Sequence, residues 1–173
     1  VEAMSICVPT PLRKTREPDV SFVVSVAERI AESLQKDQTV ILESTVYPGA
    51  TNDLVAPILE QASGLEAGQD FYIAFSPERV DPGNSKYQMQ DIPKLVGGVN
   101  QASTDQAAEL YRNVFTTVLP LSSAKEAEMA KLLENTFRAV NIGLVNELAT
   151  VSHAMGIDFW QVIDAAATKP FGF

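Results

Sequence analysis

Short, mostly apolar runs that end at polar or Pro-containing loops recur through the first 120 residues, and they restrict the fold more than any other feature. Such runs are typical of buried strands, and several are separated by stretches whose apolar residues recur at helical spacing. Strands that alternate with helices predict an α/β fold with a parallel sheet. We expect strands at residues 5–8, 39–42, 71–75, 94–98 and 117–119, and helices at residues 18–34, 51–62 and 104–115, the last with Ser103 as its N-cap.

The character of the sequence changes near residues 119–123. From residue 123 to about 155 it reads as one continuous helix, and Gly156 is a residue type favoured just after a helix ends. Asp158 then suits the N-cap of a shorter helix at residues 159–167. We therefore predict two domains, an α/β domain at residues 1–120 and an all-α domain with one long helix at residues 121–173.

Polar side chains follow three of the expected strands. Thr10 follows the first strand, Ser44 and Thr45 follow the second, and Ser76 and Glu78 follow the third. In open parallel sheets, ligands bind outside the carboxyl ends of the strands. The sequence therefore predicts that these loops converge on one crevice.

The long helix carries a polar stripe of Lys131, Asn135 and Arg138, because residues three and four apart leave a helix on the same face. A cation and an amide on a rigid helix suit a developing negative charge on oxygen, although most helical lysines are simply solvated. An apolar stripe at Met129, Leu133, Phe137, Val140, Leu144, Leu148 and Val151 predicts packing on the opposite side. The polar face itself continues into apolar residues at Ile142, Val145 and Ala149, which favours a pocket wall and a helix covered on two sides.

Composition excludes several classes of function. The chain has 13 basic and 22 acidic residues, a net charge of −9, which argues against binding to nucleic acid or anionic membranes. No apolar run reaches the roughly 20 residues that a membrane helix needs. Cys7, the only cysteine, cannot form an internal disulfide, and we expect a cytoplasmic protein without a metal site. We also expect Cys7 to be an inert residue within a buried strand.

Four motifs, in order, resemble the UDP-glucose/GDP-mannose dehydrogenase family, and most closely its UDP-GlcNAc and UDP-ManNAc 6-dehydrogenases. The motifs are Val-Pro-Thr-Pro at 8–11, Glu-Ser-Thr-Val-Tyr-Pro-Gly-Ala-Thr at 43–51, Phe-Ser-Pro-Glu-Arg-Val-Asp-Pro-Gly at 75–83 and Ala-Lys-Leu-Leu-Glu-Asn-Thr-Phe at 130–137. The resemblance covers essentially the whole chain. It implies an NAD-dependent oxidation of a sugar C6 alcohol to a uronate, through an aldehyde and a cysteine thioester, in polysaccharide biosynthesis.

The resemblance also implies roles for individual residues. Lys131 and Asn135 would stabilise the oxyanion that forms at C6. Thr45 would position a water or a substrate hydroxyl near the nicotinamide, and Glu78 would assist proton transfer or thioester hydrolysis. Thr10, Ser44 and Thr45 would bind the cofactor, and the UDP-sugar would contact Glu78, Arg79, Val80, Lys131 and Asn135.

Two family features are not present in these 173 residues. There is no Gly-x-Gly-x-x-Gly turn for a dinucleotide pyrophosphate, and no cysteine in a Gly-rich segment after the helical domain. Pro82 stands where the UDP-glucose branch has a second Glu, which favours an N-acetylated substrate. We therefore interpret the chain as an internal fragment, the second half of a Rossmann-like sheet followed by a helical middle domain, that is inactive alone.

Several alternatives stay open. Thr10 and Thr45 also suit helix caps or turns, Glu78 suits the first turn of a helix, and Arg79 suits an exposed surface. The β-hydroxyacid dehydrogenases likewise place Lys and Asn four residues apart on a long helix. A non-catalytic dimerisation module is a third possibility, since the resemblance assigns homodimer formation to the long helix. The sequence leaves open the choice of N-acetylhexosamine and the choice between NAD and NADP.

Overall fold

The computed structural model describes residues 1–80, 83 and 87–171. It divides into two compact units, Val1–Leu132 and Leu133–Phe173. The division falls inside helix α4 (Ala124–Ala154), between Lys131 and Asn135 of the predicted polar stripe. The predicted domain boundary at residue 120 remains a prediction.

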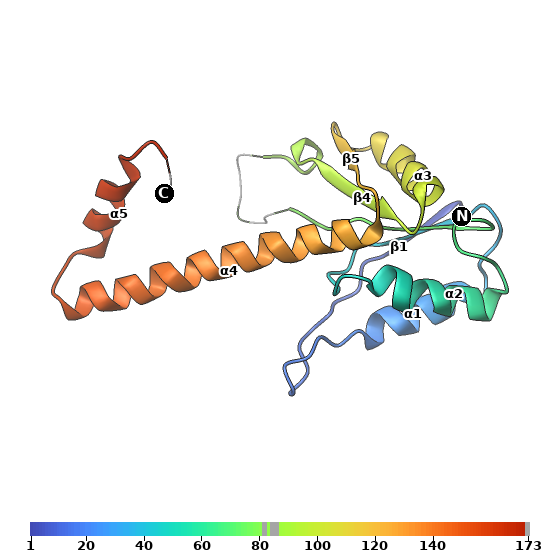
Figure 1. Ribbon diagram of the computed structural model, residues 1–173, viewed down its shortest axis with the longest axis horizontal. Coiled ribbons are helices and arrows are strands. Elements are labelled where there is room, and N and C mark those ends of the chain that lie inside the picture. The colour runs from blue at the N-terminus through green and yellow to red at the C-terminus, as the bar shows by residue number, and fades with distance from the viewer. Residues whose placement is uncertain (81–82, 84–86, 172–173) are drawn as a thin grey trace. The chain divides into compact units, whose positions relative to one another are not determined.

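The first unit is built on a five-stranded sheet in the order β1-β2-β3-β4-β5. Helices lie on both sides of this sheet (Figure 1). β1, β2 and β3 are parallel, and their last residues Ile6, Leu42 and Phe75 lie in register. The predicted bounds of β2 and β4 are confirmed. The strands are β1 (Ala3–Ile6), β2 (Thr39–Leu42), β3 (Tyr72–Phe75), β4 (Lys94–Gly98) and β5 (Val118–Pro120).

Helices cover both faces of this sheet, which explains why all four residues of β2 are buried. Val40 and Leu42 pack in one core with α1 (Ser21–Ala31) and α2 (Ala56–Ser63), while Ile41 packs in another with α3 (Gln101–Arg112). Successive side chains of a strand point to opposite faces, so one apolar run serves both cores. A short π-helical segment, Thr51–Val55, precedes α2.

The predicted N-cap of α3 was wrong. Asn100 caps this helix, because its side-chain oxygen accepts a hydrogen bond from the Ser103 N–H (2.9 Å). Ser103 lies inside the helix, fully buried, where its hydroxyl accepts a hydrogen bond from the Ile73 N–H (3.3 Å). Ser and Asn both suit the N-cap position, and the packing of α3 on β3 decides between them.

The predicted parallel sheet is confirmed for β1, β2 and β3, but β4 is antiparallel to β3, and β5 follows the direction of β4. Parallel neighbours need a crossover connection, usually a helix. Between β3 and β4, the described residues contain only a three-residue 3₁₀ helix, Met89–Asp91. The reversal places Lys94, the first residue of β4, at the edge where β1, β2 and β3 end.

A buried carboxylate joins the start of α4 to the rest of the first unit. Glu128 is fully buried and accepts hydrogen bonds from the Gly49 N–H (2.5 Å), the Thr51 N–H (2.9 Å) and the Thr51 hydroxyl (2.7 Å). These N–H groups stand at the beginning of the helical segment at Thr51, where a helix favours negative charge. Glu128, a side chain of α4, is therefore the hydrogen-bond acceptor for N–H groups at the start of a different helical segment.

In the second unit, α4 continues to Ala154 and is followed by α5 (Phe159–Ala167). Both predicted signals are confirmed: Gly156 has φ 70°, and the Asp158 carboxylate accepts a hydrogen bond from the Trp160 N–H (3.0 Å). None of the helices described is long and apolar enough to cross a bilayer.

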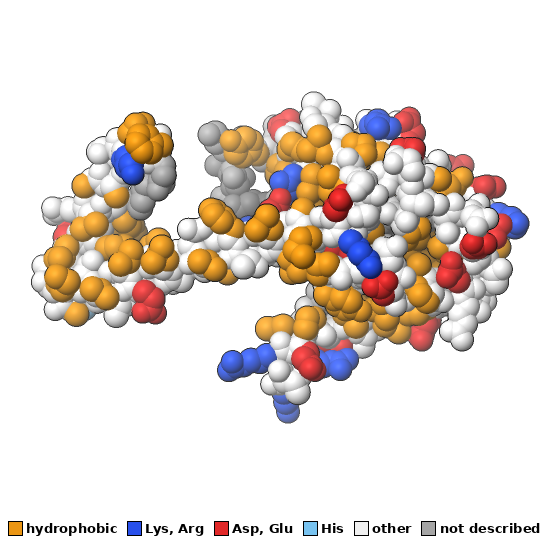
Figure 2. Space-filling model, viewed as in Figure 1, with side chains coloured by type: hydrophobic (Ala, Val, Ile, Leu, Met, Phe, Trp, Pro, Cys, Tyr) orange, Lys and Arg blue, Asp and Glu red, His pale blue; other side chains and the backbone are white. Residues whose placement is uncertain are grey.

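The expectation that α4 is covered on two sides is not met within the described residues. Phe137 is 70% exposed on the predicted core stripe, and Ile142 is 55% exposed on the other apolar face. Hydrophobic side chains lie along α4 and α5 at the surface (Figure 2). The only other helix described in this unit, α5, has nine residues and leaves both faces open.

We predict that Glu128→Ala lowers the free energy of unfolding by about 3 kcal/mol, because two buried N–H groups lose their acceptor. Urea unfolding followed by circular dichroism measures this change. Glu147→Ala, at an exposed position of the same helix, is the control and should change it by less than about 0.5 kcal/mol. Equal effects of the two substitutions would show that the carboxylate does not hold α4 in place.

Candidate functional site

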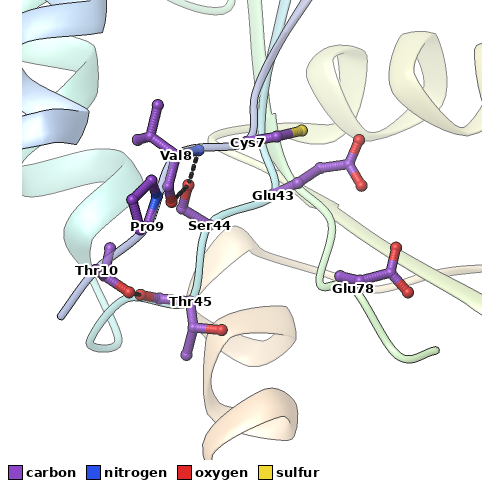
Figure 3. A pocket seen from close by; sticks show the side chains of 8 residues that line it. All are labelled: Cys7, Val8, Pro9, Thr10, Glu43, Ser44, Thr45 and Glu78. Carbon is purple, nitrogen blue, oxygen red and sulfur yellow. Dashed lines mark hydrogen bonds between the residues drawn. The ribbon is translucent and has the colours of Figure 1, made fainter. Parts of the chain in front are cut away.

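The loops that follow β1, β2 and β3 enclose a crevice of about 380 Å³ (Figure 3). This volume is within the usual range for small-molecule sites. The predicted residues Thr10, Ser44, Thr45 and Glu78 all line it, so the expected convergence of the strand ends is observed. The lining is Cys7, Val8, Pro9, Thr10, Glu43, Ser44, Thr45 and Glu78.

Two hydroxyl groups fasten the loops of β1 and β2 to each other. The Val8 N–H donates to Ser44 Oγ (2.9 Å), and the Ser44 hydroxyl donates to the Val8 carbonyl (2.7 Å). The Thr10 hydroxyl donates to the Thr45 carbonyl (2.8 Å). Ser44 and Thr10 thus have a structural role in this wall of the crevice, and their predicted contacts with a cofactor remain a prediction.

The Glu78 loop, which forms another side of the crevice, contacts a cation from α4. The Lys131 ammonium donates a hydrogen bond to the main-chain carbonyl of Glu78, while the Glu78 carboxylate accepts one from the Val80 N–H (2.5 Å). Lys131 and Glu78 are 53 residues apart in sequence. The fold therefore joins two of the predicted catalytic residues at the edge of the crevice.

Asn135, the fourth predicted catalytic residue, belongs to the second unit. Its side-chain oxygen accepts a hydrogen bond from Arg138 (2.5 Å), which confirms that these two residues share a face of α4. Its role beside Lys131 remains a prediction.

Arg79 and Val80 are not part of the crevice lining. The Arg79 guanidinium donates to the carbonyl of Pro93 (2.7 Å), just before β4, and Val80 is 40% exposed. Their predicted contacts with a sugar nucleotide remain a prediction. The structure gives Arg79 a different contact, which joins the Glu78 loop to β4.

A buried ion pair that the sequence analysis missed lies beside the crevice. The Lys94 ammonium is 2.7 Å from the Glu43 carboxylate, and the Lys94 side chain is only 4% exposed. The Tyr111 hydroxyl (2.7 Å) and the Ser5 hydroxyl (2.8 Å) also donate to Glu43. Lys94 was overlooked because a wholly parallel sheet would have placed it at the opposite edge.

This environment lowers the pKa of Glu43 and raises the pKa of Tyr111. Burial works to raise the pKa of Glu43, but the hydrogen bonds and charge of Lys94, with the hydroxyls of Tyr111 and Ser5, hold it below the usual 4.5. Burial, followed by the negative charge of Glu43, raises the pKa of Tyr111. At neutral pH the crevice wall therefore carries an ionised Glu43 beside a neutral phenol.

Cys7 was placed incorrectly by the sequence analysis. β1 ends at Ile6, and Cys7 is an exposed residue that lines the crevice, 3.1 Å from the Ser5 hydroxyl oxygen. The apolar run that predicted a buried strand extends beyond the residues that pair with β2.

Two domains of one protein family together match almost the whole chain. The NAD binding domain of the UDP-glucose/GDP-mannose dehydrogenase family matches residues 1–115, and its central domain matches residues 125–173. The chain belongs to this family. The crevice described above lies within the part that matches the NAD binding domain.

Individual relatives narrow the position within the UDP-glucose/GDP-mannose dehydrogenase family. A UDP-N-acetyl-D-glucosamine 6-dehydrogenase of Pseudomonas aeruginosa is 42% identical over 95% of this chain and 39% of its own length. The structure of a UDP-D-ManNAc dehydrogenase from Pyrococcus horikoshii matches with a TM-score of 0.92 at 39% identity, over 99% of this chain and 40% of that chain. The chain thus spans about two fifths of the length of these relatives.

A more distant likeness shows the fold alone. A 3-hydroxyisobutyrate dehydrogenase of Salmonella typhimurium has a TM-score of 0.62 at 14% identity, over 100% of this chain and 54% of that chain. At this identity the likeness extends to the fold and not to function.

We predict that Glu43 makes the folding stability of the first unit sensitive to acid. Its pKa is lowered by folding, so its stabilising effect is present above pH 4.5 and is lost as the pH falls through the lower folded value. Glu43→Gln removes this effect. The Tm difference between wild type and Glu43→Gln should therefore be largest near neutral pH and shrink below about pH 4.5. A difference that stays constant to about pH 3 would contradict the assignment.

Proposed function

We propose that the chain is part of an NAD-dependent UDP-N-acetylhexosamine 6-dehydrogenase, which oxidises the sugar C6 alcohol to a carboxylate through a cysteine thioester. The single observation that best supports this proposal is the hydrogen bond from Lys131 to the Glu78 carbonyl, since it joins the α4 cation to a loop that lines the crevice. The reactive cysteine is outside this chain, and we refer to the complete dehydrogenase as the parent protein.

The residues of the chain have distinct roles in this proposal. Lys131, with Asn135 one turn further along α4, stabilises negative charge on the C6 oxygen. Thr45 orients a water or the substrate hydroxyl, and Glu78 transfers protons or assists hydrolysis of the thioester. The Glu78 side chain is exposed on the crevice side, which gives it access to solvent water for that step.

The crevice suits one end of a dinucleotide. Thr10 and Thr45 supply polar groups, and Val8 and Pro9 supply an apolar surface for a flat ring. When bound, NAD would accept the hydride equivalents from C6, with Thr10, Ser44 and Thr45 beside it. The Gly-rich turn that holds a pyrophosphate is not among these residues, so this crevice provides only part of an NAD site.

The two relatives described above that are about 40% identical to this chain support an N-acetylated substrate, since they are named for UDP-N-acetyl-D-glucosamine and UDP-D-ManNAc. The sequence argument at Pro82 points the same way, but Pro82 lies outside the described residues. We therefore propose the substrate class, a UDP-N-acetylhexosamine, and a cytoplasmic enzyme.

The second unit supports a homodimer through the long helix. Ile142 and Val145 are 55% and 38% exposed on one face, and Leu144 and Leu148 are 56% and 48% exposed on the other. Contiguous apolar surface of this kind is characteristic of protein interfaces. We propose that α4 of a second copy covers part of this surface.

We predict that Lys131→Met in the parent protein lowers kcat by about 10²–10³-fold, because a preorganised charge donor to the oxyanion is lost. The measurement is NADH absorbance with UDP-GlcNAc and UDP-ManNAc. Lys125→Met removes another α4 cation, which is 3.4 Å from Asp53 on the surface, and should leave turnover near that of wild type. A wild-type parent that turns over neither UDP-sugar would refute the proposed activity.

The same assay separates the thioester pathway from a β-hydroxyacid dehydrogenase pathway, which uses no covalent cysteine. Alkylation should abolish turnover only in the former. Because Cys7 is exposed at the crevice, the experiment is performed on Cys7→Ser, so that loss of activity reports on a different thiol.

We predict that Ile142→Asp combined with Val145→Asp converts the parent from dimer to monomer, because two charges would be buried at the proposed interface. Light scattering measures the mass. Glu147→Gln, at an exposed position on another side of α4, is the control and should leave the dimer intact. A wild-type parent that stays monomeric at high concentration would contradict the interface.

A further inference from the structure

The crevice depends on two loops that have no strand pairing at their tips. Residues 43–45 follow β2 and carry Thr45, while residues 77–80 follow β3 and carry Glu78. Each loop contributes one residue to the proposed chemistry, so the distance between them determines whether both groups reach the same substrate atom.

Lys94, the first residue of β4, and the preceding Pro93 contact these loops. The Lys94 ammonium pairs with the Glu43 carboxylate (2.7 Å) and donates a longer hydrogen bond to the Pro77 carbonyl (3.4 Å). Next to it, the Pro93 carbonyl accepts a hydrogen bond from the Arg79 guanidinium (2.7 Å). The reversed direction of β4 makes these contacts possible, since a parallel β4 would end, rather than begin, at this edge.

Packing holds the Lys94 side chain in this position. It is 4% exposed, and its ammonium lies 4.9 Å from the ring centroid of Tyr111 and 5.4 Å from that of Phe115. The Tyr111 hydroxyl donates to the same carboxylate that Lys94 contacts. A buried cation fixed by two rings and a carboxylate has few alternative rotamers, so it can define the separation of the groups that it joins.

We propose that Lys94 is a positioning residue that holds the Thr45 loop and the Glu78 loop at their working separation through Glu43 and the Pro77 carbonyl. This inference rests on the proposed function. Lys94 does not line the crevice, and it acts on the reaction through the residues that do.

Stability alone gives a weaker reason for this ion pair. Desolvating two charges costs several kcal/mol, and well-packed apolar residues of similar size are often as stabilising. The chain also offers a comparison at the opposite edge of the sheet, where Lys36 and Asp70 precede β2 and β3. This pair has the same 2.7 Å separation, but its side chains are 68% and 30% exposed. An exposed pair of this kind has little effect on loop position.

The test compares two neutralised pairs in the parent protein, Glu43→Gln/Lys94→Met and the control Lys36→Met/Asp70→Asn. Hydrogen exchange is measured in the apo protein at residues 43–47 and 78–80. We expect faster exchange in both segments for the first variant and in neither for the control. Unchanged exchange, or a change in one segment only, would overturn the proposal whatever the activity of the protein.

Turnover provides the second readout. Glu43→Gln/Lys94→Met should lower kcat by tenfold or more, and the control should stay within twofold of wild type. In a Glu78→Gln background the Lys94 substitution should cost much less, because it acts through the Glu78 loop. If the Lys94 substitution lowers kcat by the same factor in the wild-type and Glu78→Gln backgrounds, Lys94 does not act through the Glu78 loop, and a general effect on stability explains the loss. Absence of wild-type turnover would refute the proposed function, and the exchange experiment would still decide the role of Lys94.

If the double variant does not fold, the hydrogen-exchange experiment is performed on the single variant Glu43→Gln. It removes one charge but keeps the hydrogen-bonding shape, so Lys94 retains a partner. We expect a smaller increase in exchange, at residues 43–47 only. An equal increase in both segments, or none, would contradict the proposed contact pattern.

Discussion

The buried carboxylate of Glu128 is the contact on which the candidate site depends. It fixes the first turns of α4 against Gly49 and Thr51, and Lys131 lies three residues further along the same rigid helix. A Cβ on Gly97 would stand 2.1 Å from the Ser123 carbonyl, so β4 admits the start of α4 only because it carries glycine there. These two contacts determine where the helix begins, and the geometry of the helix then places the Lys131 ammonium at the Glu78 loop.

The fold was predictable where local pattern and burial agree. The bounds of β2, β4 and α5 follow from apolar runs and from the cap at Asp158, because these signals lie within a few residues. The direction of β4 was not predictable in this way. Direction depends on the connection between β3 and β4, and an apolar run looks the same in parallel and antiparallel strands.

The site was predictable to a similar extent. The rule that ligands bind beyond the carboxyl ends of strands correctly grouped Thr10, Thr45 and Glu78. It could not find Lys94, since a lysine at the start of a strand reaches this edge only when the strand is reversed. The exposure of Cys7 had a similar cause, because the apolar run continues past the last residue of β1 that pairs with β2.

Local charge explains how a chain with a net charge of −9 can still suit an anionic ligand. Two carboxylates, Glu43 and Glu78, line the crevice and would repel a dinucleotide or a sugar nucleotide. Lys94 pairs with the first, and Lys131 binds the main chain of the second. The Glu43 carboxylate therefore has a cation from a distant part of the sequence beside it, and the Glu78 loop has one at its main chain. The Lys94 side chain is buried, so the Lys94–Glu43 pair acts with less screening than charges on the outer surface and offsets the repulsion that Glu43 would otherwise exert.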